Sequence, residues 1–317
     1  MSRWYLKITV WYGHFREILY TVLGIYLIVL LLRYPVLSLQ YAATGLQLWF
    51  QKMIPTLLPF MILSGILIAM NLTEKFVKVL HPLLHTIYRI SPNGSYTLFM
   101  GFLCGFPMGA RIVGQLREQG KLSRKEGSLL LAFCNNIGPI YFLSYVVPTL
   151  SIEKPLICFS IMYGVPLLYG ILVMRLSPMS SLFVTEKQEI SKKTAPPNSL
   201  LFAIDTAIQS GLIGIAKLGG YMIFFNLLNI MFVPFHHLPM GLLACYQLLL
   251  EITSGIDQYG HLYPYAVLVL LPFGGFSCIA QTYSMIRHTD LSIRSYLFHK
   301  LAQTGLTALC YLMIRPF

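Results

Sequence analysis

The sequence predicts an all-α, polytopic integral membrane protein built from two inverted-topology repeats that contain broken or re-entrant helices. The first observation is composition: 56% of the 317 residues are hydrophobic and 11% are charged, whereas soluble domains carry about 25% charged residues. The second is a pair of Gly-Pro interruptions inside apolar stretches, GFPMG (Gly105–Gly109) and CNNIGP (Cys134–Pro139). The third is an approximate duplication of short motifs. Together they indicate a chain that uses lipid as its solvent and breaks its helices at membrane depth.

A series of apolar stretches predicts the membrane segments. A spanning helix needs about 20 apolar residues, so 96–110 and 263–281 are expected as half-helices or re-entrant hairpins. Residues 1–35 are expected to hold an uncleaved N-terminal transmembrane helix; a signal peptide is the alternative, but no convincing small-x-small site directly follows the apolar run. The expected segments are 18–33, 54–70, 96–110, 127–148, 155–175, 217–233, 239–255, 263–281 and 295–314.

Two further stretches are expected to lie at the membrane interface or to pack against the helix bundle. Val36–Lys52 interleaves polar residues with apolar ones, and Glu74–Arg89 places its apolar residues on one helical stripe. His81 and His85 stand at i and i+4 in the second stretch. A basic amphipathic helix accounts for both histidines without a metal.

A polar stretch divides the chain into two similar halves. Residues 177–199 end in a Pro-Pro pair and are expected to form a cytoplasmic linker. It would separate a first repeat at 36–176 from a second at 200–317. Short matches in the same order support the duplication: GFPMGA (Gly105–Ala110) with GFSCIA (Gly275–Ala280), Leu122-Ser123 with Leu291-Ser292, and Leu58–Ile62 with Gly219–Ile223.

The basic residues predict how the halves are oriented. Most of the 23 Lys and Arg residues lie between apolar stretches, as expected for cytoplasmic loops. With these loops inside, the two halves run in opposite directions, which is an inverted repeat. Arg287 and Arg294 then fall on the outer side, contrary to the positive-inside rule. The stretches expected inside are Arg3–Arg16, Lys75–Arg89, Arg111–Lys125 and Arg175–Lys193.

Composition and motifs argue against other classes of protein. The formal charge is +12, but the basic residues are not gathered on a soluble face, so nucleic-acid binding is not expected. The sequence has no HExxH, GxSxG or P-loop motif and no carboxylate cluster, so we expect neither an enzyme nor a metal or cofactor. The six cysteines form no CxxC pair and are expected to be small buried hydrophobes.

Asn135 and Asn136 lie in the second Gly-Pro interruption. Each amide offers two donors and an acceptor, while Gly138 and Pro139 open the helix and free nearby carbonyls. This arrangement is typical of a solute or ion site. The alternative is that the two amides only cap a broken helix.

Glu251 follows a run of leucines and precedes Thr253, Ser254 and Gly255, where the helix is expected to break. A carboxylate within the membrane is costly and therefore predicts function. The alternative is a position near the interface, or a structural pair with Lys217 or Arg111.

Arg111 follows the first interruption, where a helix starting near Met108 would present its N-terminal amides to an anion. An arginine there would add a bidentate donor for a carboxylate; a cytoplasmic positive-inside arginine is the alternative. Gln281 stands at the matching place in the second half and is a neutral ligand candidate. The backbone is expected to turn at Gly105, Pro107, Gly109, Gly274 and Gly275.

These residues resemble the Gate, or nucleoside-recognition, superfamily of membrane proteins, and within it the sporulation integral membrane proteins of the YlbJ (SpoVV) type. The resemblance spans most of the chain from about residue 36. It implies a polytopic, duplicated helical protein related to concentrative nucleoside transporters. Ser277 stands where the first GF motif has Pro107, so the two breaks differ. The resemblance rests on GFPMGARIVGQLREQGKLSRKEGSLLLAFCNNIGP (Gly105–Pro139), LLLEITSGI (Leu248–Ile256) and FGGFSCIAQTYSMIRHTDLSIRSYLFHKL (Phe273–Leu301).

For the YlbJ type, the resemblance implies a role in endospore formation. The implied function is a transporter or facilitator that moves a small organic anion, dipicolinic acid, from the mother cell towards the forespore. The implied location is the mother-cell-derived outer forespore membrane, with the lipid bilayer as a partner. By motif match, the site residues carried over are Gly105, Pro107, Gly109, Asn135, Asn136, Gly138, Pro139, Glu251, Thr253 and Gly255.

A small aromatic dianion suits a midplane pocket of half-helix N-termini, asparagine donors and one arginine. Glu251 would then carry a coupling proton or cation, or repel the ligand to help its release. Two alternatives stay open. One is a nucleoside-like solute transporter of the same superfamily, and the other is a membrane scaffold or gate that is needed for sporulation and transports nothing.

Overall fold

The computed structural model describes residues 2–177, 199–235 and 237–314, and every regular element in these ranges is helical. The predicted all-α, polytopic fold is therefore confirmed. The expected linker at 177–199 lies almost wholly outside the described residues. Within them, the helical runs long and apolar enough to cross a membrane are His14–Arg33, Pro35–Ala69, Arg124–Thr149, Pro155–Leu176, Leu200–Phe235 and Pro264–Ile286.

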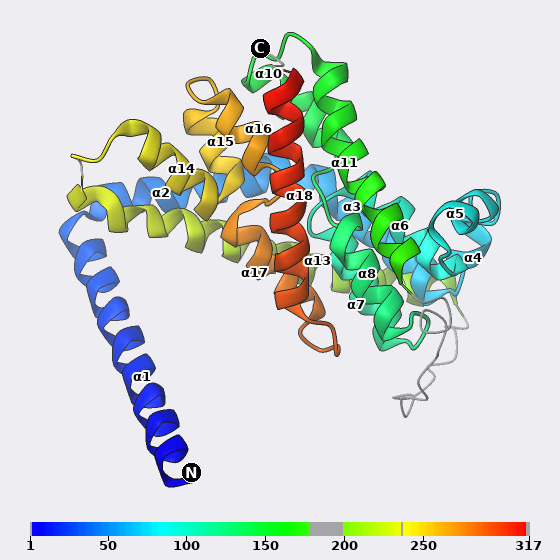
Figure 1. Ribbon diagram of the computed structural model, residues 1–317, viewed down its shortest axis with the longest axis horizontal. Coiled ribbons are helices and arrows are strands. Elements are labelled where there is room, and N and C mark those ends of the chain that lie inside the picture. The colour runs from blue at the N-terminus through cyan, green and yellow to red at the C-terminus, as the bar shows by residue number, and fades with distance from the viewer. Residues whose placement is uncertain (1, 178–198, 236, 315–317) are drawn as a thin grey trace.

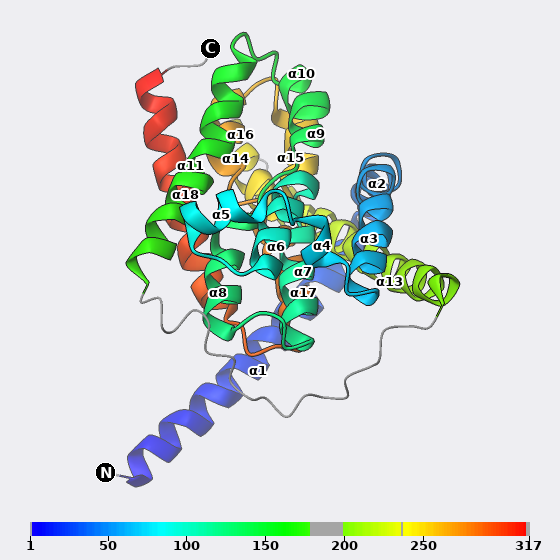
Figure 2. The same ribbon diagram turned by 90° about the vertical axis from the view of Figure 1, so that its right-hand side faces the viewer.

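Helix α1 extends away from the other helices, which pack together (Figures 1 and 2). The first half of the chain contains α1 (Ser2–Arg33), α2 (Pro35–Leu48), the π-helical turn η1 (Trp49–Met53), α3 (Ile54–Ala69), α4 (Thr73–Phe76), α5 (His81–Tyr88), α6 (Pro92–Cys104), α7 (Met108–Glu118), α8 (Arg124–Cys134), α9 (Pro139–Tyr141), the π-helical turn η2 (Phe142–Val146), α10 (Val147–Thr149) and α11 (Pro155–Leu176). The second half contains α13 (Leu200–Leu227), the 3₁₀ helix η3 (Leu228–Phe235), α14 (Met240–Leu250), α15 (Ile252–Tyr259), α16 (Pro264–Leu270), α17 (Gly275–Ile286) and α18 (Ile293–Ile314).

A long helix from each half forms a frame: α2, η1 and α3 run on continuously, and α13 lies along them, crosswise to α11 and α18 (Figure 1). The Trp49 indole donates a hydrogen bond to the Ile215 carbonyl at 2.8 Å. An added Cβ on Gly65 would lie 3.0 Å from the Ala207 Cβ, so a small residue sets how closely the two helices approach.

The frame corrects two sequence predictions. The stretches 36–52 and 54–70 are not separate elements, because a π-helical turn carries the helix through Trp49–Met53. The segment expected at 217–233 is the end of a helix that begins at Leu200. Asp205 and Gln209 lower the apolarity of its first half, but both side chains are exposed and their amide and carboxylate bond to each other at 3.0 Å.

After each frame helix, and after α4 and α5 in the first half, a similar order of elements follows in the two halves. In the first half, the α6/α7 hairpin is followed by a broken helix (α8 to α10) and then by α11. In the second half, α14 and α15 fold back on one another and are followed by a broken helix (α16 and α17) and then by α18. Residues 263–281 therefore contain half-helices, the first of the two expected forms, and not a re-entrant hairpin: α16 and α17 belong to one interrupted apolar run, Pro264–Ile286.

The element order also changes the pairing that the sequence suggested. GFPMGA lies at the turn of the α6/α7 hairpin, whereas GFSCIA begins α17 inside the broken helix. By element order, the counterpart of the turn at Gly105–Pro107 is Glu251. The counterpart of the break at 135–138 is the break at 271–274. Short sequence matches could not distinguish these two kinds of interruption, because both need glycine.

An ion pair between a buried arginine and a partly exposed aspartate joins the halves at one end of the molecule. Arg117 on α7 donates to both carboxylate oxygens of Asp290, at 2.9 and 2.8 Å, and to the Leu122 carbonyl at 3.0 Å. Asp290 lies between α17 and α18, so Arg287 and Arg294 lie at the same end as the α7–α8 turn (Figure 2). The expectation that these two arginines fall on the side opposite Arg111–Lys125 is wrong.

We predict that Asp290→Ala lowers the free energy of unfolding by about 2 kcal/mol at neutral pH, because it removes two charge-assisted hydrogen bonds from a buried guanidinium. These hydrogen bonds lower the pKa of the Asp290 carboxyl. The pair therefore stabilises the protein above the ordinary aspartate pKa, and this contribution is lost as the pH falls through the lowered value. Thermal unfolding in detergent across a pH series measures the difference.

Arg124→Ala is the matched control, because Arg124 is exposed and its Nε lies 3.7 Å from Asp290. Arg124→Ala should lower the free energy of unfolding by less than about 1 kcal/mol. Equal costs for the two variants would contradict the importance assigned to Arg117.

Candidate functional site

The two interruptions of the first half pack directly on each other. Gly105 ends α6 with φ +85°, and Gly138 precedes α9. A side chain on Gly105 would overlap the backbone nitrogen of Gly138. Gly138 in turn faces the Cys104 carbonyl: an added Cβ on Gly138 would lie 2.8 Å from the Cys104 carbonyl oxygen. Glycine is needed at this crossing because two backbones occupy the space that a side chain would fill.

The interruptions of the second half meet in the same way. Gly274 and Gly275 begin α17 with φ +76° and +77°. An added Cβ on Gly275 would lie 3.0 and 3.1 Å from the Leu249 and Leu248 carbonyl oxygens, at the end of α14. An added Cβ on Gly274 would lie 3.2 Å from the Phe106 ring. Through Phe106, the breaks of the two halves come together.

Two glycines that were predicted to break helices do not. Gly109 lies inside α7 and Gly255 inside α15. Their role is close packing: an added Cβ would lie 2.7 Å from the Cys134 carbonyl oxygen at Gly109, and 2.8 Å from the Leu248 Cα at Gly255. The other predicted positions, Gly105, Pro107, Gly138, Pro139, Gly274 and Gly275, do flank breaks.

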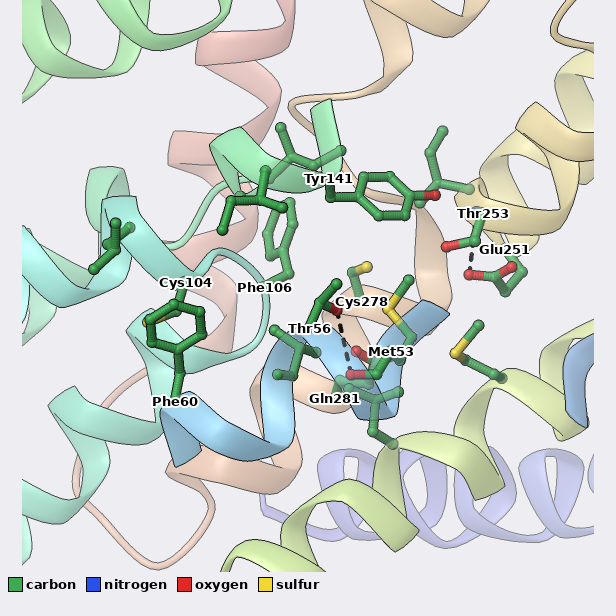
Figure 3. A pocket seen from close by; sticks show the side chains of 18 residues that line it. Met53, Thr56, Phe60, Cys104, Phe106, Tyr141, Glu251, Thr253, Cys278 and Gln281 are labelled. Carbon is green, nitrogen blue, oxygen red and sulfur yellow. Dashed lines mark hydrogen bonds between the residues drawn. The ribbon is translucent and has the colours of Figure 1, made fainter. Parts of the chain in front are cut away.

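A pocket of about 70 Å³ lies where the breaks meet the frame (Figure 3). Its walls come from both frame helices, from both interruptions of the first half, from the α14–α15 break and from α17. The lining residues are Met53, Thr56, Leu57, Phe60, Leu103, Cys104, Phe106, Ile137, Gly138, Ile140, Tyr141, Leu218, Met222, Glu251, Ile252, Thr253, Cys278 and Gln281.

Three predicted ligand residues line this pocket: Glu251, Thr253 and Gln281. Glu251 is buried and caps α15, because its carboxylate accepts from the Ser254 amide at 2.7 Å and the Thr253 amide at 3.3 Å. In Figure 3 the Tyr141 hydroxyl points towards Thr253 and Glu251. The pocket is thus apolar with one polar side, the usual form of a small-molecule site.

Asn135 does not line the pocket. Its Oδ1 accepts from the Ala110 amide at 3.2 Å, and its Nδ2 donates to the Thr282 hydroxyl at 3.0 Å and to the Tyr296 hydroxyl at 3.1 Å. The side chain therefore joins α7, α17 and α18 at the end of α8. The alternative to a solute site was that the amide caps a broken helix; the observed bonds instead connect Asn135 to three other helices.

Asn136 holds a buried cation that sequence reasoning missed. Its Nδ2 donates to the Phe133 carbonyl at 2.5 Å, and its Oδ1 accepts from the Lys300 ammonium at 2.6 Å. Lys300 lies on α18 and is fully buried. The available clue was a lysine inside the apolar stretch 295–314, because a charge within a membrane segment predicts function.

Arg111 lies in the first turn of α7, as predicted, but its guanidinium is directed at the frame. Nη2 donates to the Ser210 hydroxyl on α13 at 2.9 Å. Nη1 is close to Gly214 and has no hydrogen-bond partner among the described residues. Glu251 forms no ion pair with Arg111 or Lys217 within the described chain. Over the same residues, no group of three or more His, Cys, Asp or Glu residues is placed to hold a metal.

The helices and the pocket define a polytopic membrane protein whose interrupted helices surround an internal cavity. A family model described as Gate, nucleoside recognition, matches residues 50–174. Those residues contain α3 and all the elements from the α6/α7 hairpin to α11, apart from the last residues of that helix. Over these residues the chain is similar to the Gate family.

The whole chain is similar to the sporulation integral membrane protein YlbJ of Bacillus subtilis (strain 168). The two are 26% identical over 332 aligned residues, which cover 92% of this chain and 80% of the relative. No solved structure matches the chain. The similarity to YlbJ extends beyond residues 50–174 into the second half, which supplies Glu251, Gln281 and Lys300.

Gly105→Ala is expected to lower the free energy of unfolding by about 3 kcal/mol, because the left-handed backbone is strained for alanine and the new methyl group overlaps Gly138. Gly220→Ala on α13 is the control, since an added Cβ there meets no atom within 4 Å. Thermal unfolding in detergent compares them. A cost below about 0.5 kcal/mol for Gly105→Ala would refute the backbone crossing.

Asn135→Ala is expected to cost about 3 kcal/mol of unfolding free energy, because each of its three hydrogen bonds contributes about 1 kcal/mol. Gln209→Ala removes an exposed amide and should change stability by less than about 0.5 kcal/mol. The same unfolding measurement applies to both. An unchanged midpoint for Asn135→Ala would mean that its hydrogen bonds do not join the helices.

Proposed function

We propose that this protein is a sporulation-associated membrane transporter or facilitator that passes a small organic solute through the pocket at Glu251. The observation that carries the proposal is the position of that pocket. It lies where interrupted helices from both halves meet, which is the usual construction of solute sites in secondary transporters. The sporulation role rests on the similarity to YlbJ.

We further propose that the two halves form an inverted repeat. The order of elements supports this, as does the direction of the chain. The α8–α10 helix begins at the end of the molecule that holds the Arg117–Asp290 pair, whereas α17 finishes there (Figures 1 and 2). Arg287 and Arg294 then join Lys121 and Arg124 at one end, so the positive-inside rule places that end in the cytoplasm.

Our leading substrate is dipicolinic acid, moved from the mother cell towards the forespore across the outer forespore membrane. The support is the resemblance to the YlbJ type together with a pocket whose apolar walls suit an aromatic ring. Glu251 reaches this pocket and is the acidic group available there to carry a coupling proton or cation. We assign it that role.

A nucleoside-like solute is the second candidate. The observation that favours it is the neutral hydrogen-bonding character of several wall residues. Thr56, Thr253, Gln281 and Tyr141 offer hydroxyl and amide groups without a net charge. The family model's description, nucleoside recognition, points the same way.

The test is complementation of a Bacillus subtilis strain that lacks YlbJ, with dipicolinate measured in spores and in mother cells. The chain should restore spore dipicolinate. The Thr56→Trp variant should insert in the membrane, but its activity in restoring spore dipicolinate should be at least about ten-fold lower, because an indole fills the pocket. Uptake of labelled dipicolinate and of labelled uridine by proteoliposomes identifies which solute moves.

Thr86→Trp is the matched control, because Thr86 is exposed on α5 and lies outside the pocket. It should behave as the wild type. Full rescue by Thr56→Trp, together with no uptake of either solute, would favour a scaffold and reject transport through this pocket.

A further inference from the structure

Lys300 is a charged group in the core of the helical bundle. Its side chain is fully buried on α18. The ammonium donates to Asn136 Oδ1 at 2.6 Å and to Gln303 Oε1 at 3.5 Å. Within the described chain, no carboxylate lies within ion-pair distance of it. A buried charge held only by neutral groups is costly, and such a charge is usually retained for a function.

The ammonium lies next to the pocket, with one aromatic ring in contact with both. Lys300 Nζ lies 5.0 Å from the centroid of the Phe106 ring and 5.8 Å from that of Tyr296. Phe106 lines the pocket (Figure 3), whereas Lys300 does not. Phe106 belongs to the turn between α6 and α7, where the backbone leaves the helix. Its ring therefore shields the cation from the pocket.

The charges on the pocket wall are otherwise wrong for an anion. Glu251 reaches the pocket, and among the described residues no lysine or arginine lines it. Arg111 is directed at Ser210 on the frame. An organic anion that enters the pocket needs a positive partner, because a carboxylate without one is poorly tolerated in a low-dielectric site. Lys300 can supply that charge from behind Phe106.

We infer that Lys300 is the anion-binding residue of this pocket, and that a rotation of the Phe106 ring exposes its ammonium to a carboxylate of the solute. This inference rests on the proposed function and narrows the substrate class to organic acids. In the empty pocket, the ammonium is held by Asn136 and the Phe106 ring. When the solute binds, its carboxylate replaces the ring as the partner of the cation.

A purely structural role for Lys300 makes a different prediction. Gln303 donates to the Ala132 carbonyl at 2.6 Å, near the end of α8, and a lysine beside a helix C-terminus stabilises it. Replacing a structural lysine changes the stability of the protein and affects the affinity for every ligand equally. An anion-binding lysine affects the preference between a charged solute and its neutral analogue.

The experiment uses the purified full-length protein in nanodiscs and calorimetric binding of two probes of the same shape, with uridine as a third probe. Dipicolinate carries two carboxylates, and pyridine-2,6-dicarboxamide carries none. The wild type should bind dipicolinate about ten-fold or more tightly than the diamide. Lys300→Met should abolish that preference, and Lys300→Arg should keep most of it. Lys52→Met removes a cation at the frame, over the Tyr145 ring, and should leave the preference unchanged.

Phe106→Leu keeps the test decisive if Lys300→Met fails to fold. It removes the competing ring, so the affinity for dipicolinate should rise several-fold while the affinity for the diamide stays constant. Phe102→Leu, near the end of α6 and outside the pocket, should change neither affinity. A charge preference that survives in Lys300→Met, or a Phe106→Leu variant with unchanged affinities, overturns the inference.

The binding panel also separates this inference from the proposed function. If the wild type binds uridine or the diamide without preferring dipicolinate, the proposed solute site stands and the role inferred for Lys300 is rejected. A wild-type protein that binds none of the three probes contradicts the proposed function itself.

Discussion

Backbone amides and carbonyls that leave a helix inside a bilayer need partners within the protein, because the hydrocarbon core offers none. This chain meets the requirement by packing its breaks against one another. Gly105 lies against Gly138 in the first half, and Gly275 against the end of α14 in the second. Side chains complete the arrangement: Glu251 caps the start of α15, and Asn135 accepts from the Ala110 amide in α7. The pocket lies where these crossings meet the frame.

The buried polar residues divide into two groups: those that only hold helices together, and those that hold helices together and also reach the pocket. Asn135 bonds to three other helices and holds the breaks in place. Glu251 does both, since its carboxylate caps a helix and also reaches the pocket. A residue of this second kind links the state of the pocket to the conformation of the helix it caps.

The pocket is shared between two parts of the structure. One wall belongs to the frame of α3 and α13, and the other to the interrupted helices. The frame is closely packed through Trp49, Gly45 and Gly65. The interrupted helices are joined to each other by buried bonds, among them the pair of Arg117 with Asp290. The volume of the pocket therefore depends on the relative position of the frame and the interrupted helices. A change in that relative position is the kind of motion that alternating access requires.

The sequence by itself determined the class of the protein and several of the places where its helices break. Composition is a bulk property, and the turns at Gly105–Pro107, Gly138–Pro139 and Gly274–Gly275 follow from local backbone preferences. It also indicated Glu251, Thr253 and Gln281, which do reach the pocket.

Only the tertiary structure decided which polar groups face the pocket and which hold the helices together. Lys300 and Asn136 are 164 residues apart in sequence and hydrogen-bonded in space. The side on which Arg287 lies likewise depends on contacts between distant helices. A motif specifies a local conformation, but the direction in which a side chain points is set by the neighbours that pack around it.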